Sequence, residues 1–422
     1  MTTALVVSFA TVNANEMTDS DVKLSVNGSI DAKMANVQQK ENFRYKTVGG
    51  KTDKLSNNNI ATDAYLNFNI KGIVDSGLKY GGLIKLNANT SKSKKEMYDN
   101  GDKQSIAEQV MAYLESGYGR VEVGNYTGVA ESMKVNAGTF ASATGGINGD
   151  SQYYWNASTV ENEKDVNGKD VMDAEGNIIK VKTKTAFLQT ANLPTNELGT
   201  FGLRGVNAAK LNYYTPEFSG FRFGATFTPN TKVHGTTSSV TSVVKDEAGG
   251  FKNVFETGLS YTNEIKDVGV KFAVVGEFGK NQEKDVKNLR AYEVGTNLSY
   301  KGFTVGGSYG DWGKYGASTA ANAVEFGKTS YWAAGVGYAN GPISASITHL
   351  QGKKGIAKVS DNKTHNKLRN TVIGVDYKVA PGILPYVEFS SFKMNQASQA
   401  SATNKDNNNK GHIFMTGVKL SF

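Results

Sequence analysis

The chain contains no cysteine, only 6 prolines among its 422 residues, and no uninterrupted apolar run of about 18 residues. The lack of cysteine excludes a disulfide scaffold and a thiolate metal site. The lack of a long apolar run excludes a membrane-spanning helix, because such a helix needs about 20 mostly apolar residues. If the protein crosses a membrane, it must do so in another way.

Histidine is also scarce. The 4 histidines share no spacing typical of metal ligands, and they are His234, His349, His365 and His412. The sequence also lacks the G-x-S-x-G, H-E-x-x-H, P-loop and dinucleotide-binding motifs that carry common enzyme chemistry. We therefore expect no catalytic residue, no metal site and no cofactor, and we predict that the protein is not an enzyme. A barrel hydrolase, with an acid, a base and a nucleophile at one rim, stays a formal alternative.

Charge is dispersed along the chain. The 47 basic and 39 acidic side chains leave a net charge of +8. There is no basic block of the kind that binds nucleic acid, and dispersed charge is typical of solvated surface. We therefore expect no nucleic-acid partner.

Glycine and aromatic residues are plentiful, with 47 glycines and 10% aromatic residues. The hydrophobic fraction of 39% and the mean hydropathy of -0.40 resemble those of a soluble protein. They also suit a transmembrane β-barrel, because the interior of such a barrel is polar.

The final segment, GHIFMTGVKLSF (411–422), shows the pattern that organises the chain. Side chains alternate between the two faces of a strand, so this segment has one mainly apolar face and one more polar face. The apolar face carries Phe414, Thr416, Val418, Leu420 and Phe422, and the other carries Ile413, Met415, Gly417, Lys419 and Ser421. Such a strand needs either a core to pack on or lipid to face.

The same alternation recurs from residue 21 to the end. The predicted strands come in pairs joined by short turns, and long polar connections join the pairs. They are 21–35, 61–72, 77–89, 106–116, 118–126, 207–215, 220–228, 251–264, 267–280, 289–300, 302–311, 328–339, 342–351, 367–379, 382–394 and 411–422. Sixteen strands with short turns at one end and long loops at the other indicate an all-β, antiparallel transmembrane barrel spanning residues 21–422. Such a sheet must close in lipid, so the last strand must pair with the first, with Phe422 at the closure.

Aromatic residues gather where the predicted strands meet the short turns. Such rings favour the boundary between lipid and water and form girdles there, whereas in a soluble sandwich they would gather at mid-strand. These residues are Tyr118, Tyr213, Tyr214, Phe218, Phe221, Tyr261, Tyr300, Phe303, Tyr338, Tyr377 and Phe422.

Residues 1–14 (MTTALVVSFATVNA) are apolar and rich in small side chains, and Val12-Asn13-Ala14 fits an A-x-A-like cleavage site. We interpret this segment as the remnant of a secretory signal peptide whose basic beginning is missing, and we expect export. An ordinary first strand is the alternative.

Two hairpins carry a more specific signal. Residues 113–125 (YLESGYGRVEVGN) contain two short strands around a Gly-aromatic-Gly turn, and residues 211–225 (LNYYTPEFSGFRFGA) follow the pattern Y-x-[ST]-P-x-F-x-G-F-x-x-G. Together with the carboxy-terminal aromatic residue, these segments resemble the general (non-specific) porins of Gram-negative bacterial outer membranes. The resemblance extends over nearly the whole chain.

The resemblance implies a homotrimer of sixteen-stranded barrels surrounded by outer-membrane lipid. Each barrel would be a water-filled pore for passive diffusion of ions and small hydrophilic solutes, with the short turns and both termini in the periplasm. The long third loop, here residues 127–206, would fold into the lumen, and its first part, residues 128–148, is small and apolar enough to pack there. In the family, the returning strand of the hairpin that resembles residues 113–125 ends in Gly-Arg. This chain has Gly124-Asn125 there, so we expect the usual arginine of the constriction to be absent.

Alternation also predicts which charges face the lumen. The basic set is Lys23, Lys33, Lys71, Lys79, Lys85, Arg120, Lys210, Arg222, Lys271, Lys378 and Lys419, and the acidic set is Asp31, Glu115, Glu122, Glu256, Glu277, Glu293, Asp376 and Glu388. The basic excess favours anions. Such charges select ions only where the pore is narrow, because salt screens them beyond about 8 Å. We predict a constriction in which the wall residues Lys85, Arg120 and Glu122 face Glu131 and Asp150 of the infolded loop.

Two alternative functions stay open. A substrate-specific channel of the same fold would be favoured by an aromatic ladder or a dense basic track at the constriction. A soluble surface or adhesin-type β-protein would instead have two stacked sheets with a dry interior.

Overall fold

The computed structural model describes residues 12–13, 22–48, 51–89, 107–157, 160–162, 169, 172, 180–182, 187–197, 208–231, 250–359, 363–397 and 408–422. Most of the predicted signal segment 1–14 and parts of the predicted loop 127–206 lie outside these residues.

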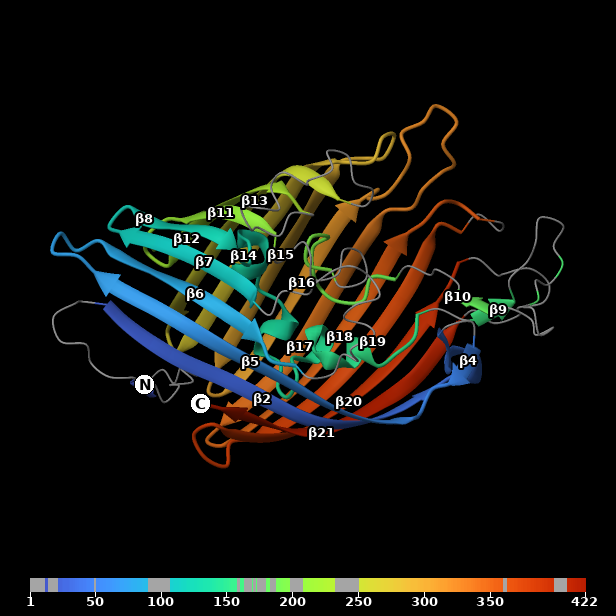
Figure 1. Cartoon of the computed structure of the whole chain (residues 1–422), viewed down its shortest axis with the longest axis horizontal. Coiled ribbons are helices and arrows are strands. Elements are labelled where there is room, and N and C mark those ends of the chain that lie inside the picture. The colour runs from blue at the N-terminus through green and yellow to red at the C-terminus, as the bar shows by residue number, and fades with distance from the viewer. Residues whose placement is uncertain are drawn as a thin grey trace.

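Sixteen long strands form one closed antiparallel barrel (Figure 1). They are β2 (Val22–Gln39), β5 (Asn58–Ile73), β6 (Lys79–Asn87), β7 (Ala107–Ser116), β8 (Gly119–Asn125), β11 (Ala209–Tyr214), β12 (Phe221–Asn230), β13 (Phe251–Ile265), β14 (Val268–Asn281), β15 (Leu289–Tyr300), β16 (Phe303–Gly313), β17 (Thr329–Asn340), β18 (Ile343–Gly355), β19 (His365–Tyr377), β20 (Ile383–Asn395) and β21 (Asn409–Ser421). The short β1 (Val12–Asn13) also pairs with β2. The predicted fold class is therefore confirmed, and the predicted strand ends lie within about four residues of the observed ones.

Short turns and long connections alternate around the barrel. The short turns lie toward the left and the bottom of Figure 1, and the long connections lie toward the right and the top. Residues between β2 and β5 form η1 (Glu41–Phe43), β3 (Tyr45–Val48) and β4 (Lys51–Lys54). Residues between β8 and β11 form α2 (Val129–Ser132), η2 (Ala137–Phe140), η3 (Gly146–Asn148), η4 (Asp150–Tyr153), β9 (Val160–Asn162) and β10 (Lys180–Lys182). Among the described residues, none of the helices is long and apolar enough to cross a membrane.

Backbone conformation keeps two of the turns tight. Lys266 and Asp267 have φ values of 48° and 65°, and Lys301 and Gly302 have 45° and 86°. Two successive left-handed residues are characteristic of type I′ turns, whose twist matches that of the flanking strands. These turns therefore hold β13 against β14 and β15 against β16 in fixed register.

The barrel closes where β21 pairs with β2, from Ser29–Ser421 to Gln39–Gly411. The amide of Gly28 donates to the carbonyl of Phe422 at 2.9 Å, and the amide of Phe422 donates to the carbonyl of Gly28 at 3.1 Å. A Cβ at Gly28 would lie 2.6 Å from the Phe422 ring, so glycine leaves room for that ring at the seam.

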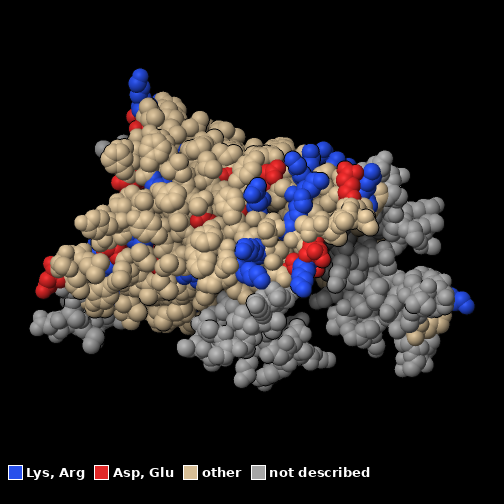
Figure 2. Space-filling model, turned by 90° about the horizontal axis from the view of Figure 1, so that it is seen from above, with Lys and Arg blue, Asp and Glu red and all other residues tan. Residues whose placement is uncertain are grey.

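The outer surface of the barrel is apolar and exposed. Leu114 on β7 and Val123 on β8 are 54% and 57% exposed, whereas inward-facing Glu256 and Glu277 are 3% and 0% exposed. This distribution is the reverse of that in a soluble β-sandwich and contradicts the soluble surface-protein alternative. Figure 2 shows one such face, where uncharged residues dominate the middle and charged residues of both signs gather toward the right-hand end, which carries the long connections.

Most of the predicted girdle residues face outward near the short turns. Tyr118 is 90% exposed and Phe218 is 78% exposed, and the rings of Phe303 and Tyr338 pack with centroids 4.5 Å apart. Tyr214 is an exception, because it is only 6% exposed and its hydroxyl lies 2.8 Å from the hydroxyl of Ser132. Its assignment to the girdle was wrong, since alternation along β11 turns it inward while Tyr213 faces out.

The inner face is less polar than the alternation indicated. Ile413 and Met415, which share a face with Lys419 of β21, are completely buried. They belong to an apolar cluster that also contains Ile147, Trp155 and Leu188 from the residues between β8 and β11. Part of the inner wall therefore packs against protein instead of water.

Candidate functional site

The inner wall carries the candidate site, and the residues between β8 and β11 divide it into two arcs. Helix α2 contacts β12, β13 and β14, η2 contacts β16, β17 and β18, and η3 contacts β18 and β19. In Figure 1 these short helices appear in green in front of the far strands. We call the strands β12–β20 the covered arc and β5–β8 the open arc. The strands β21, β2 and β11 lie between the two arcs and also contact the connection.

Carboxylates of the covered arc bind the connection between β8 and β11. The backbone amides of Ala130, Ala143 and Thr144 donate to Glu256, Asp376 and Glu388 at 2.8, 2.8 and 3.0 Å. The Asn136 side chain donates to Glu293 at 3.1 Å, and the amide of Thr195 donates to Glu277 at 3.2 Å. All five carboxylates were predicted to face the lumen, but each is under 9% exposed. They act as hydrogen-bond acceptors for the connection and are shielded from water.

Inward-facing glycines give the same connection a close fit. A Cβ at Gly224 would lie 2.6 Å from the sulfur of Met133, one at Gly295 would lie 1.7 Å from the carbonyl oxygen of Val135, and one at Gly337 would lie 3.0 Å from the Phe140 ring. Similar close approaches occur at Gly258, Gly335 and Gly374. Glycines at inward positions of the strands mark the surface on which the connection packs. They were visible in the sequence, but our prediction of the inner wall did not use them.

Arg120 and Glu122, two of the predicted constriction residues, lie together on the open arc. The Nε of Arg120 donates to Glu122 at 2.7 Å, and its guanidinium also lies 3.4 Å from Glu115 and over the Tyr113 ring at 3.8 Å. Glu122 accepts a further hydrogen bond from Asn212 at 3.1 Å. One guanidinium therefore links two carboxylates on neighbouring strands.

Lys85 also lies on the open arc, but its partner was not foreseen. Its Nζ lies 3.0 Å from Glu108 and 4.2 Å from the centre of the Tyr65 ring. The pairing of β6 with β7 shifts register between Lys85 and Leu86, next to Glu108. Because a bulge breaks the alternation of faces, a strict period of two cannot identify the side of the barrel on which Glu108 lies.

The two predicted loop residues pair with other groups. Glu131 forms an ion pair with Lys134 at 2.5 Å, and Asp150 forms one with Lys33. Lys33 also lies 3.1 Å from Asp31 and 2.7 Å from Asp63. Within the described ranges, no ion pair joins Glu131 or Asp150 to Lys85, Arg120 or Glu122. The position of these five residues at a constriction stays a prediction.

The remaining predicted lumen charges occupy different environments. Lys79 is exposed and lies 3.3 Å from Glu115, whereas Lys210 is only 5% exposed. Arg222 lies over the Tyr214 ring at 4.8 Å. Lys378 follows the end of β19 and is exposed in a short turn, so it is not a residue of the strand wall as the alternation predicted.

Tyrosines and cations pair repeatedly along the inner wall. The pairs are Tyr65 with Lys85, Tyr113 with Arg120, Tyr214 with Arg222, and Tyr386 with Lys419, whose Nζ lies 5.5 Å from the ring centre. Because the carboxylates of the covered arc are shielded, the charge that stays accessible on the inner wall is mainly basic. Exposed basic residues there are Lys23, Lys71, Lys79 and Lys271.

A second part of the connection, residues 187–197, contains a buried acid. The carboxylate of Glu197 is fully buried and accepts hydrogen bonds from the amide of Gln189, at 2.6 Å, and from the hydroxyl of Thr190. Burial raises the pKa of Glu197 to about 7, although the hydrogen bond from Thr190 and the positive charge of Lys354 oppose the rise. In the part of the chain that the structure describes, no cluster of three or more His, Asp or Glu residues could hold a metal ion.

Solved barrels of low sequence identity share the fold. The anion-selective porin from Comamonas acidovorans is 12% identical, with a TM-score of 0.54, over 95% of this chain and 100% of that chain. A loop-deletion mutant of OmpT, an outer membrane protein of Vibrio cholerae, is 9% identical, with a TM-score of 0.52, over the same shares of the two chains.

Sequence comparison identifies nearer relatives and a family. An uncharacterized protein of Rickettsia bellii is 24% identical over 88% of each chain. One of Rickettsia felis is 26% identical over 74% of this chain and 75% of its own. The family model described as Gram-negative porin matches residues 2–397, nearly the whole chain. The protein therefore belongs to the Gram-negative porin family.

Proposed function

We propose that the protein forms a water-filled channel in the outer membrane through which ions and small hydrophilic solutes diffuse passively. The observation that carries this proposal is the reversed polarity of the barrel, which has an exposed apolar outside and charged side chains inside. A bilayer stabilises such an outer face, and a charged inner face favours water over apolar solutes. Membership of the porin family supports the same function.

The connection between β8 and β11 would narrow this channel from one side. Its contacts with the covered arc are held by buried carboxylates and by glycines without side chains, so it has little freedom to move away. The solute path would then run between this connection and the open arc. Lys85, Arg120 and Glu122 would line one side of it, and Glu131 and Asp150 would line the other.

Ion preference follows from which charges stay accessible to water. Five acidic side chains of the covered arc are occupied by the connection, whereas Lys23, Lys71, Lys79 and Lys271 are exposed. These four lysines lie toward the short-turn ends of their strands, at one mouth of the proposed channel. Basic side chains attract anions and repel cations. We therefore expect this mouth of the channel to favour anions.

The number of barrels that associate and the direction in which each barrel crosses the membrane are taken from what is usual in the family. We propose a homotrimer in outer-membrane lipid, with the short turns and the end at Phe422 facing the periplasm. The long connections would then face the exterior.

Conductance in planar bilayers under a salt gradient tests the proposal, because it reports pore activity and ion preference together. Deleting residues 128–148 should raise the conductance of single channels, since this segment would no longer narrow the path. Deleting residues 320–324, which are exposed between β16 and β17, is the control and should leave conductance unchanged. No conductance from correctly folded protein would refute the channel, and an unchanged value for the first deletion would refute the narrowing.

A substrate-specific channel for anionic solutes is a second candidate. The four tyrosine–cation pairs favour it, because each offers a charge and an aromatic face at one place. Such a channel should saturate as the concentration of its solute rises, whereas passive diffusion should stay proportional to concentration. Liposome swelling with graded concentrations of small phosphorylated sugars, against uncharged sugars of equal size, separates the two.

A further inference from the structure

The outer face of β18–β21 carries five exposed cations near the long-connection end. Alternation turns them outward, because each of them is exposed whereas its two neighbours in the strand are buried or intermediate. We call them the basic patch, and they are Lys353, Lys367, Arg369, Lys393 and Lys410.

Strand register sets like charges directly opposite one another in the basic patch. Lys353 pairs with Lys367 across β18 and β19, and Arg369 pairs with Lys393 across β19 and β20. Lys393 in turn pairs with Lys410 across β20 and β21. Opposite residues in an antiparallel pair lie about 5 Å apart, and like charges there are destabilising. Three such pairs side by side need a counter-charge.

The protein does not provide that counter-charge within the described residues. The acids on these strands, Asp376 and Glu388, face inward and bind Ala143 and Thr144. No ion pair with a described carboxylate involves the basic patch, although the Nε of Arg369 donates to the amide oxygen of Gln351 at 3.0 Å. An external anion would therefore meet several cations that have no counter-charge among the described residues.

The next rows toward mid-strand change character in order. Two residues from Arg369, Lys393 and Lys410 along their strands lies a row of outward hydrogen-bonding side chains. The row consists of His349, Thr371, Ser391 and His412, and the Nδ1 of His349 lies 2.8 Å from the hydroxyl of Thr371. Two residues further toward mid-strand, the outward side chains are apolar. They are Ile347, Ile373, Phe389 and Phe414, each at least 39% exposed. Each step is two residues, or about 7 Å along the strand. Charge thus gives way to polar and then to apolar surface within about 14 Å.

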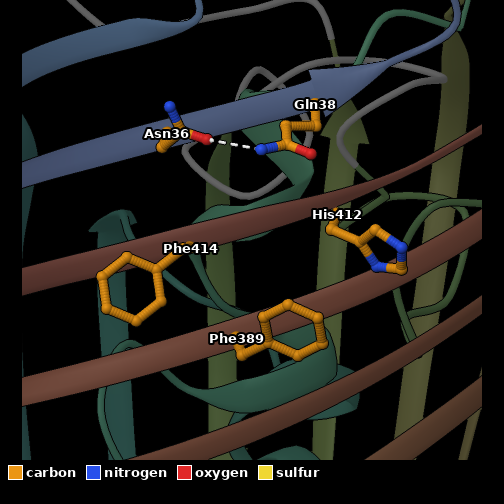
Figure 3. Close-up of a pocket in the computed structure, with 5 residues that line it drawn as sticks. All are labelled: Asn36, Gln38, Phe389, His412 and Phe414. Carbon is orange, nitrogen blue, oxygen red and sulfur yellow. Dashed lines mark hydrogen bonds between the residues drawn. The ribbon is translucent and has the colours of Figure 1, made fainter.

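A shallow pocket lies where these rows cross β20, β21 and β2. Its lining consists of Asn36, Gln38, Phe389, His412 and Phe414 (Figure 3). The rings of Phe389 and His412 are stacked with centroids 5.4 Å apart, and Gln38 donates to Asn36 at 3.4 Å. The pocket therefore offers two aromatic rings beside amide groups, directly next to Lys393 and Lys410 in register.

We propose that this surface is a binding site for a phosphorylated lipid of the outer leaflet. The phosphate of the headgroup lies on the basic patch, the polar linkage lies against the row from His349 to His412, and an acyl chain lies along Phe389 and Phe414. Phosphate oxygens accept charge-assisted hydrogen bonds from Lys and Arg and relieve the repulsion between them. A soluble anion or a nucleic acid would use only the first of the three rows. The site rests on the proposed orientation, with the long connections at the exterior of the outer membrane, but not on solute passage, so it can fail while the channel stands.

The test measures lipid binding to the full-length, detergent-solubilised protein by native mass spectrometry. The probes are a glucosamine-disaccharide lipid with two phosphates (lipid A) and the same lipid after both phosphates have been removed. The test variant is Lys353→Gln/Lys393→Gln/Lys410→Gln. The matched control is Lys266→Gln/Lys301→Gln/Lys378→Gln, which removes three exposed lysines from the short turns.

We expect the unaltered protein to prefer the phosphorylated lipid by at least tenfold. Each Lys near a membrane surface contributes about 1 kcal/mol, so the test variant should bind it roughly 100-fold more weakly. The control should stay within about threefold. Equal loss in both variants, or equal binding of both lipids, would overturn the proposal. Displacement of the lipid by millimolar inorganic phosphate, but not by chloride at matched ionic strength, would assign the patch to soluble phosphate instead and would also overturn it.

Discussion

A Cβ atom on Gly295 of β15 would lie 1.7 Å from the carbonyl oxygen of Val135. The backbone of the wall and the backbone of the connection between β8 and β11 therefore touch, with no side chain between them. The contact requires glycine for space and not for conformation, since Gly295 is not among the residues with positive φ. Any side chain at this position must push the connection away from the wall.

Gly295→Ala should therefore shift the connection near Val135 and destabilise the fold. Overpacking of a close contact costs about 1–3 kcal/mol. We expect a lower temperature for the gel-mobility change that marks barrel unfolding, together with a changed single-channel conductance. Gly117→Ala is the control, because a Cβ there meets nothing within 4 Å. Identical behaviour of the two variants would show that the contact does not hold the connection.

Thr144→Val tests the hydrogen bonds that hold the connection on β20. The Thr144 hydroxyl donates to Glu388 at 2.7 Å and accepts from the amide of Asp150 at 3.0 Å. Valine keeps the shape and removes both bonds, so unfolding in denaturant should become easier by about 1–3 kcal/mol. Thr296→Val, whose hydroxyl donates to the exposed carbonyl of Lys271 at 3.1 Å, should change stability by less than about 1 kcal/mol. A reversed ranking would contradict this role of Thr144.

Glu197 should make stability depend on pH. Its pKa is about 7 in the folded protein and 4.5 without burial, so the folded state binds the proton more tightly. The contribution of Glu197 to stability should therefore be greatest below pH 4.5, fall as pH rises toward 7, and level off above it, with a change of up to about 3 kcal/mol.

The Glu197→Gln variant isolates this effect from other titrating groups. The variant stays neutral at all pH values, so the difference in unfolding free energy between the variant and the unaltered protein should grow between pH 5 and pH 8. Chemical denaturation in detergent at several pH values measures it. A difference that is constant over this range would contradict the raised pKa.

Arg120→Gln should shift ion preference toward cations. The change leaves Glu115 and Glu122 without their shared partner on the open arc. One unit charge at about 4 Å in water is worth about 1 kcal/mol, so the ratio of anion to cation permeability should fall by up to about fivefold. Reversal potentials under a salt gradient give this ratio. Lys301→Gln, in an exposed turn, is the control, and an equal shift in both would exclude Arg120 from the constriction.

Removal of Phe422 should weaken closure of the barrel. The deletion removes two backbone hydrogen bonds to Gly28 and the ring that packs there, worth about 1–3 kcal/mol together. We expect a lower yield of folded barrel in detergent refolding, measured by gel mobility without heating. Phe218→Ala removes an aromatic residue that is 78% exposed and should refold normally. Normal refolding of the deletion would exclude a role for Phe422 at the seam.

Much of the fold could be predicted because apolar side chains that face lipid alternate with more polar side chains that face inward along each strand of a barrel. The alternation along β14 and β15, with Val274 and Leu298 outward and Glu277 and Glu293 inward, needs no tertiary information. The candidate site was harder. Arg120 and Glu122 are two residues apart in one strand, so they had to share a face, whereas the partners of Glu131 and Asp150 depend on the path of a long connection. The bulge beside Glu108 shifts which side chains of β7 face inward, and no particular residue type in the sequence marks its position.

The sequence by itself determined the number of strands, their order and which face meets lipid, because each of these depends on residues close together in the chain. Closure followed from the rule that a sheet in lipid leaves no edge unpaired. Only the tertiary structure decided what the inner wall binds. Glu388 and Thr144 are 244 positions apart, and nothing in either segment specifies their contact. Whether a lumen carboxylate stays in water or accepts a hydrogen bond from the connection depends on the packing of both in space, and the charge left to act on solutes depends on that packing.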